Sequence, residues 1–199
     1  MGVVTTSTRY RRLAPGVVSA AAVAGGYVLV VRGDLTLDVG WGRSTLALGP
    51  QRVDIAAPRA VVFEVISAPY LGRTPKAMDR KLEVIVRGAD MVLAAHHTPA
   101  VAGLVATTIE TVRFDPPERV EFRLVRGPVP HVTETFLLHE VETGTRLEYA
   151  GELGVDFFAL GRLWGKAVAR RWEAAVAGSL AGIRAESERR AAHVGKPRA

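Results

Sequence analysis

The chain has 199 residues, carries a formal net charge of +6 and contains no cysteine. The absence of cysteine excludes a disulfide framework, a thiolate metal site and a cysteine nucleophile. About 150 residues remain after the first 50, which is the size of one ordinary domain. The excess of basic residues lies near the two ends and has no interleaved aromatic residues. A surface that stacks nucleic-acid bases is therefore not expected.

The N-terminal part contains an uncharged apolar run over residues 13–31, which follows Arg9, Arg11 and Arg12. About 20 apolar residues are needed for a helix to cross a bilayer, and this run just reaches that length. Residues 1–32 are therefore predicted to form a basic segment and an uncleaved, single-pass transmembrane helix. A cleaved leader with small residues at 22–24, and a segment that is simply part of a soluble protein, are the alternatives.

The same segment carries an expectation about location. The three arginines before the run favour an N-terminus in the cytoplasm and a folded domain outside it. Basic residues at both chain ends also fit attraction to anionic lipid headgroups, although a merely soluble basic surface has the same composition. A membrane location is predicted, with a cytoplasmic protein as the alternative.

Residues 33–50 are rich in glycine and are predicted to be a linker, with an edge segment of the domain as the alternative. Alternation then predicts a strand over 51–57, and Pro58 begins a short helix with an apolar face. A run of strands separated by glycine and proline signals follows. The expected strands cover 82–87, 91–98, 104–114, 120–125, 132–140 and 146–153.

The last element is a long amphipathic helix, because apolar residues recur at intervals of three or four between residues 157 and 183. The stripe consists of Phe157, Leu160, Trp164, Val168, Trp172, Val176, Leu180 and Ile183. Residues 191–199 are predicted to be a basic tail. A long helix with a single apolar face must lie against a curved sheet. The predicted class is α+β: a helix-grip fold of about seven antiparallel strands wrapped on the C-terminal helix, with an extra N-terminal hydrophobic helix.

Local sequence resembles the START-like superfamily, also called the SRPBCC or birch-pollen-allergen fold. Residues 53–58, followed by 61–66 and Pro69, are similar to its opening strand and helix. Residues 144–147 are similar to its penultimate hairpin, and 164–180 to its closing helix. The resemblance covers about residues 51–190 and is nearest to the polyketide cyclase/dehydrase-like group. It implies an elongated hydrophobic cavity for lipids, polyketides or other apolar molecules, and it carries no universal catalytic motif.

Two adjacent histidines lie in the strand over 91–98 and must point to opposite faces. His97 shares its face with Met91, Leu93 and Ala95, so it is expected to face the interior. An imidazole in an apolar pocket can act as a general acid or base near neutral pH. A core or rim histidine with an ordinary hydrogen bond is the alternative.

Two carboxylates and one tyrosine are further candidates. Glu110 and Glu134 each lie on a strand face with apolar neighbours, and burial there would raise the pKa of either carboxyl. A solvated outer face is the alternative for both. Tyr149 is expected to face inward, where its hydroxyl would orient a ligand or simply fill core volume. His97 and Glu134 are the catalytic candidates. The predicted ligand-binding set is His97, Glu110, Phe122, Glu134, Phe136, Tyr149, Trp164 and Val168.

No phosphate-binding loop, hydrolase nucleophile elbow, dinucleotide fingerprint or zinc-ligand spacing is present in the sequence. No metal and no cofactor are therefore expected. The predicted function is transport or sequestration of a hydrophobic small molecule or lipid by a membrane-tethered domain. The alternatives are a polyketide cyclase/dehydratase-like enzyme using an interior histidine and carboxylate, and a scaffold whose interior is filled. An imidazole and a carboxylate within hydrogen-bond reach inside the domain would favour the enzyme.

Overall fold

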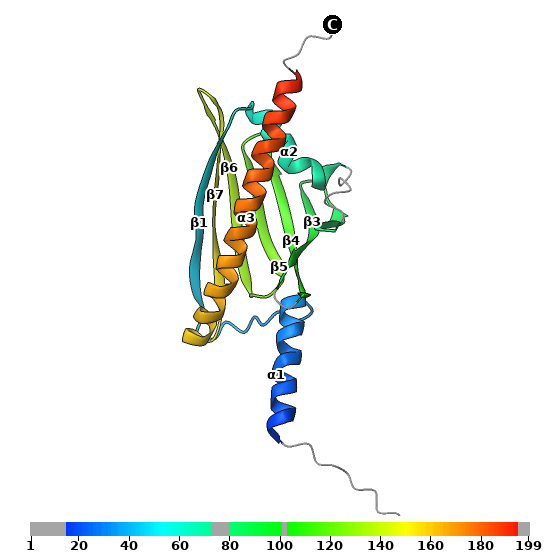
Figure 1. Cartoon of the computed structure of the whole chain (residues 1–199), viewed down its shortest axis with the longest axis vertical. Helices are drawn as coiled ribbons and strands as arrows, with labels where there is room; N and C mark the ends of the chain where they lie inside the picture. The colour runs from blue at the N-terminus through cyan, green and yellow to red at the C-terminus, as the bar shows by residue number, and fades with distance from the viewer. Residues whose placement is uncertain (1–14, 73–79, 101–102, 195–199) are drawn as a thin grey trace, which may run out of the picture.

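A seven-stranded antiparallel sheet dominates the computed structural model, which describes residues 15–72, 80–100 and 103–194 (Figure 1). The strand order across the sheet is β1-β7-β6-β5-β4-β3-β2. Neighbouring strands from β2 to β7 follow one another along the chain, and β1 closes the far edge by pairing with β7. The strands are β1 (Ser44–Ile55), β2 (Leu82–Arg87), β3 (Met91–Pro99), β4 (Val105–Asp115), β5 (Arg119–Arg126), β6 (His131–Val141) and β7 (Gly144–Val155).

Two helices cover one face of this sheet: α2 (Arg59–Leu71) and the long α3 (Phe158–Val194), which lies across the strands (Figure 1). Alternation along the strands sends one set of side chains toward these helices. In β6, for example, Val132, Glu134, Phe136 and Leu138 are buried. The predicted α+β class, with a curved antiparallel sheet and a long C-terminal helix, is confirmed.

The first turns of α3 come very close to the sheet because two positions there are glycine. A Cβ atom at Gly165 would lie 2.7 Å from Val155 Cγ1 and 2.8 Å from Leu46 Cδ1. A Cβ atom at Gly161 would lie 1.5 Å from the carbonyl oxygen of Asp156. Any larger residue at either position would push the helix away from β1 and β7.

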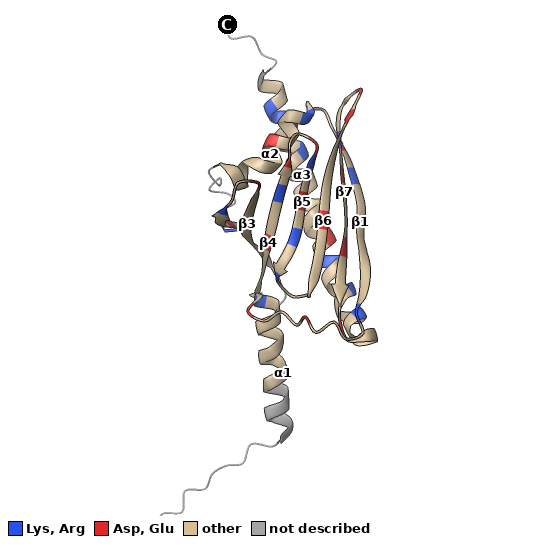
Figure 2. Cartoon of the chain, turned by 180° about the vertical axis from the view of Figure 1, so that it is seen from behind, with Lys and Arg blue, Asp and Glu red and all other residues tan. Residues whose placement is uncertain are grey.

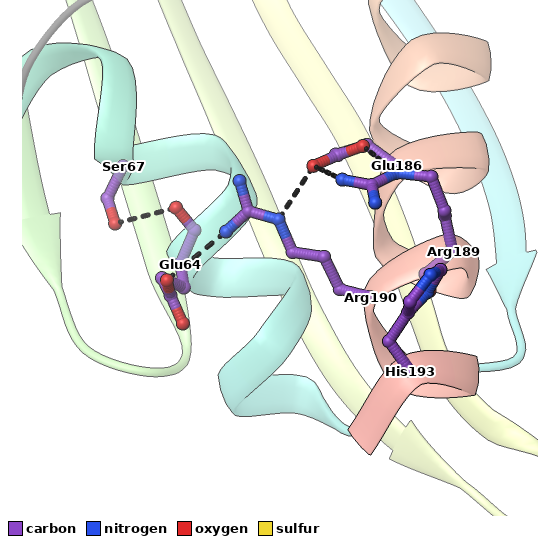
Figure 3. A network of polar contacts seen from close by, with 6 residues as sticks. All are labelled: Glu64, Ser67, Glu186, Arg189, Arg190 and His193. Carbon is purple, nitrogen blue, oxygen red and sulfur yellow. Dashed lines mark hydrogen bonds and ion pairs between the residues drawn. The ribbon is translucent and has the colours of Figure 1, made fainter. Parts of the chain in front are cut away.

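At the other end of α3, an ion-pair network joins the helix to α2 (Figure 3). Arg190 donates to Glu186 Oε1 on its own helix at 2.7 Å and to Glu64 Oε1 on α2 at 3.1 Å. Arg189 donates two further hydrogen bonds to Glu186, each at 2.8 Å. These arginines lower the pKa of Glu186 to about 2, so the network is ionised at neutral pH.

The structure differs from the expected linker over 33–50. Strand β1 begins at Ser44, and its first half pairs with the end of β7 from Ser44↔Val155 to Leu48↔Gly151. Residues before it are also bonded to the domain, since the Thr36 hydroxyl donates to the Gly127 carbonyl at 2.8 Å. Strand pairing decides the structure of the part of this segment that begins at Ser44, and the sequence pattern alone does not reveal where that strand begins.

Helix α1 (Pro15–Arg32) projects from the end of the domain where β4 begins (Figure 1). Its last turns contact the domain: Tyr27 packs edge-to-face on Trp164 at 6.0 Å, and Val31 is buried. This helix carries no charged side chain before Arg32, and its described part is accordingly tan in Figure 2. Among the described residues, no helix combines the length and apolar character needed to cross a bilayer. The predicted single-pass anchor stays a prediction; Arg9, Arg11, Arg12 and residues 195–199 of the basic tail lie outside the described residues.

Candidate functional site

The buried carboxylate of Glu134 lies where the sheet meets α3. Its Oε1 atom accepts a hydrogen bond from the Tyr149 hydroxyl on β7 at 2.6 Å and a second from Trp172 Nε1 on α3 at 2.6 Å. The tyrosine is placed by the neighbouring strand, whose register puts Phe136 opposite Tyr149 and Glu134 opposite Gly151. Three elements therefore converge on one carboxylate oxygen in the interior.

A second polar group lies on the same face of the sheet, nearer to its other edge. His96 Nδ1 on β3 lies 3.1 Å from Glu110 Oε2 on β4, an ion-pair distance without an aligned hydrogen bond. The other ring nitrogen, Nε2, lies 2.9 Å from the Tyr70 hydroxyl on α2. Glu110 is buried, whereas 23% of the His96 side chain remains exposed. The histidine is thus the member of this group that solvent reaches.

A row of aromatic rings connects the two polar groups. Tyr70 lies 6.0 Å from Phe122, Phe122 lies 5.5 Å from Phe136, and Phe136 lies 5.2 Å from Tyr149, measured between ring centroids. The strand register places Phe122 on β5 directly opposite Glu134 on β6. The interior face therefore has an apolar, aromatic centre with a titratable group at each side.

Burial sets the protonation of these groups. Burial, followed by the nearby negative charge of Glu110, raises the pKa of Glu134 to about 7. Burial alone would also raise the pKa of Glu110, but the His96 cation outweighs it and holds that pKa below its usual value. For His96, burial lowers the pKa, and the Glu110 carboxylate more than reverses that effect. The result is an ion pair at one side and a carboxyl that exchanges protons near neutrality at the other.

This arrangement suits acid–base chemistry on an apolar molecule. A catalytic group works best when its pKa lies close to the working pH, as it does for Glu134. The low dielectric around buried groups also strengthens each electrostatic interaction with a reacting atom. Perturbed titratable groups that converge in a fold's interior are typical of functional sites, although structural ion pairs produce similar shifts.

The predicted site residues differ in how deeply the structure buries them. Glu110, Phe122, Glu134, Phe136 and Tyr149 are all buried on the interior face of the sheet. On α3, Trp164 and Val168 are half-buried and pack against the same core. The Trp164 indole donates to the Pro128 carbonyl at 2.9 Å, so it also fixes the β5–β6 turn.

The expectation that His97 faces the interior is wrong. Val92 and Ala94 belong to the core, so His96 occupies the interior face of β3. His97 lies on the other face, with Nδ1 3.2 Å from Thr107 Oγ1 and Nε2 3.9 Å from the exposed Glu83. Both faces of this strand are apolar in sequence, so alternation could not choose between the two histidines.

Sequence reasoning also missed Tyr70 and gave Trp172 only a packing role. Tyr70 follows Pro69 within α2, where the sequence predicts the helix to end. Its position beside His96 depends on how α2 crosses the sheet, and no local pattern carries that information. For metals, the described residues contain no group of three or more His, Asp or Glu suited to hold an ion.

Comparisons with known proteins agree with this fold. The aromatase/cyclase Zhui from Streptomyces sp. R1128 superposes with a TM-score of 0.55 at 20% identity, over 78% of this chain and 99% of that one. The di-domain aromatase/cyclase StfQ of the steffimycin biosynthetic pathway gives 0.61 at 16% identity, over 75% of this chain. This chain spans about half of StfQ and of the similar di-domain protein BexL, 52% in each case.

These identities establish a shared fold, and a sequence comparison adds the family. No curated protein matches the sequence. A family model described as polyketide cyclase / dehydrase and lipid transport matches residues 50–188, which include the whole sheet apart from the first half of β1. The resemblance to the SRPBCC-like fold is thereby confirmed, and the chain belongs to the polyketide cyclase / dehydrase and lipid transport family.

Proposed function

We propose that this domain binds an apolar small molecule rich in carbonyl groups between the sheet and α3 and catalyses its cyclisation or dehydration. The observation that carries the proposal is that one interior face of the sheet holds both the Glu134 carboxyl, whose pKa is about 7, and the His96–Glu110 ion pair. Membership of the family and the aromatase/cyclase neighbours support the same reaction class.

The proposed chemistry assigns separate roles to the two polar groups. Ionised Glu134 removes a proton from a carbon between two carbonyls, and the resulting carbanion attacks a second carbonyl within the same molecule. His96, as a cation, donates a proton to the oxygen of the attacked carbonyl, which becomes a hydroxyl group. The neutral His96 then removes the second proton from the attacking carbon while protonated Glu134 donates its proton to the hydroxyl, which leaves as water, so both groups return to their starting states. The aromatic row holds the apolar substrate by burying its surface, at roughly 25 cal/mol per Å² before the cost of association.

The test uses a synthetic linear poly-β-ketone thioester and follows loss of water by mass spectrometry. Removing a general acid or base lowers rates by about 100-fold or more. We therefore expect that loss in Glu134→Gln and in His96→Asn, while His97→Asn keeps the wild-type rate. The histidine pair is a matched control, since the two side chains differ only in the face of β3 that they occupy. Equal rates in all variants would contradict the proposal.

A second candidate is binding without reaction, as in a carrier of lipids or other hydrophobic molecules. It is favoured by the mutual pairing of the interior polar groups, in which Glu134 contacts Tyr149 and Trp172 while His96 contacts Glu110 and Tyr70. Native mass spectrometry of the purified chain would reveal a co-purified apolar ligand. A tightly bound poly-β-ketone that is never converted would favour this carrier role over the enzyme.

We also propose that residues 1–32 hold the chain at a membrane, with the folded domain outside the cytoplasm. The support is the uncharged run 13–31 behind three arginines, together with the position of α1, which projects away from the domain (Figure 1). Flotation of the full chain with vesicles of phosphatidylcholine and phosphatidylglycerol tests the membrane association. A chain that stays with the soluble fraction would contradict it.

A further inference from the structure

Large apolar side chains are exposed at the end of the domain from which α1 projects. They come from residues 33–43, which run past the ends of the strands between α1 and β1, and from the first turns of α3 (Figure 1). The exposed fractions are 65% for Trp41, 73% for Leu160 and 67% for Leu163. We call this surface the α1-side face; its members are Leu35, Leu37, Val39, Trp41, Phe158, Leu160 and Leu163.

The sequence pattern predicts a different place for one of these residues. Leu160 continues the apolar stripe of the closing helix and would be expected in the core, but it is the most exposed of the seven. Gly165 faces Val155 and Leu46 of the sheet, whereas Leu160 lies on a part of the helix surface that the sheet does not cover. The apolar side chains of Leu160 and Leu163 therefore add little to the packing of the described domain.

Backbone contacts join the two segments into one structured surface. The amide of Phe157 donates to the Trp41 carbonyl at 2.7 Å, and the amide of Phe158 donates to the Gly42 carbonyl at 3.1 Å. The Trp41 ring lies edge-to-face on Phe157 at 6.3 Å and on Phe158 at 5.3 Å. A third link is Asp156, whose Oδ2 accepts the amides of Val39 and Gly40 at 2.8 and 2.9 Å.

The chain adopts an unfavourable backbone conformation at this surface. Phe157 and Phe158 have φ angles of 68° and 53°, in the left-handed region that bulky residues rarely occupy. Such conformations persist where surrounding contacts impose them, and they gather at functional sites. Here the result leaves 53% of the Phe158 side chain exposed. Exposed apolar side chains gathered at one end of a domain are typical of an interaction surface.

We propose that the α1-side face lies in the headgroup region of an anionic membrane, with Trp41, Phe158, Leu160 and Leu163 among the lipids. Aromatic rings concentrate at that depth of a bilayer. The exposed cations Arg32, Arg162 and Lys166 belong to the same segments and are attracted to anionic headgroups. The exposed acids of residues 33–43 are Asp34 and Asp38, and Asp38 is already paired with Arg43. The proposal rests on the proposed membrane tether, since α1 enters the domain at this same face.

Because the chain has no cysteine, single cysteines test the proposal in the full-length protein. Leu160→Cys and Leu163→Cys carry an environment-sensitive fluorophore, and Glu142→Cys is the matched control. Glu142 lies in the turn before β7, and α3 starts just after the other end of that strand. The labelled chains are mixed with phosphatidylcholine–phosphatidylglycerol vesicles containing nitroxide lipids. We expect at least threefold stronger quenching at positions 160 and 163 than at 142.

The outcomes separate this proposal from the tether. If the chain floats with vesicles but labels at 160 and 163 are quenched no more than the label at 142, the tether stands and membrane contact by this face is overturned. If the chain does not float, both fail. A spectral shift that occurs without vesicles and grows with protein concentration would identify a second copy of the chain as the occupant, and would overturn the proposal.

Discussion

The indole of Trp172 and the carboxylate of Glu134 join the closing helix to the sheet through one hydrogen bond of 2.6 Å. The acceptor oxygen also receives the Tyr149 hydroxyl, so it is shared between α3 and β7. A buried carboxylate is costly unless it is hydrogen-bonded, and these two donors lower the cost. The position of α3 over the sheet and the ionisation of Glu134 are therefore linked.

Truncation of Trp172 separates packing from this hydrogen bond. Trp172→Ala should destabilise the fold by about 3 kcal/mol, because it removes a large ring from the helix–sheet contact. Trp172→Phe keeps most of the apolar surface and loses only the donor, so about 1 kcal/mol is expected. Urea denaturation measures both.

Leu163→Ala, at an exposed position on the same helix, is the control and should change the free energy of unfolding by less than about 0.5 kcal/mol. A Trp172→Ala variant as stable as that control would contradict the packing of this helix face.

Glu134 makes stability depend on pH in a defined direction. Its pKa is about 7 in the folded chain, against an ordinary glutamate value of 4.5. Between these values the folded state binds more protons than the unfolded state, so the free energy of unfolding falls as pH rises. We expect Glu134→Gln to lose less stability than the wild type between pH 5 and pH 8, measured by denaturation at each pH.

The raised pKa of His96 acts in the same direction. Its larger cause, the Glu110 carboxylate, remains in Glu134→Gln, so the difference between the two proteins reports Glu134 together with its smaller effect on His96. Glu142→Gln, an exposed matched change, should follow the wild type. Parallel curves for wild type and Glu134→Gln would show that the carboxyl titrates normally.

The sequence was sufficient for the interior face wherever alternation is clean. In β7, alternation predicted that Tyr149 points inward; in β6 it placed Glu134 on the face of Val132, Phe136 and Leu138, but its charge left a solvated outer face as the alternative. In β3, Met91 and Leu93 on one face are as apolar as Val92 and Ala94 on the other, so the inward histidine was predicted wrongly. Alternation shows which side chains point inward only when one face of the strand meets water and the other meets the core.

Convergence across strands was beyond local pattern. The contact between His96 and Glu110 requires the β3–β4 register, which pairs His96 with Thr108 and Ala94 with Glu110. Tyr70 arrives from α2, 26 residues before His96 in the chain. Register and helix placement depend on packing of the whole domain, so sequence pattern gave the candidate carboxylates without their partners.

The two neighbouring histidines should respond differently to the same substitution. His96→Leu leaves Glu110 buried without its cation, and removal of one partner of a buried ion pair costs about 3–5 kcal/mol. His97→Leu loses a hydrogen bond to Thr107 and a long contact with the exposed Glu83, and should cost less than about 1 kcal/mol. Urea denaturation of both variants measures these losses, and the midpoints can be compared directly when the slopes of the transitions are unchanged.

A double variant, His96→Leu with Glu110→Leu, tests the cause of that loss. Replacing both members of a buried ion pair with apolar residues is often neutral or stabilising, so part of the lost stability should return. Failure of the second substitution to restore any stability would mean that the histidine acts through packing against Phe122, whose ring lies 6.2 Å away, rather than through its charge.

Deletion of residues 1–26 should remove vesicle association while the domain stays folded. Among the described residues of this segment, 22–25 are exposed, and a Cβ at Gly25 or Gly26 would meet nothing within 4 Å. The contacts that join α1 to the domain include Tyr27, which packs on Trp164, and the buried Val31. A deletion through residue 32 should therefore be less stable than one ending at 26. Circular dichroism melts of both variants measure the stability of the domain, and flotation with vesicles measures the membrane association. A chain that lacks residues 1–26 and floats as well as the full chain would place the membrane attachment elsewhere.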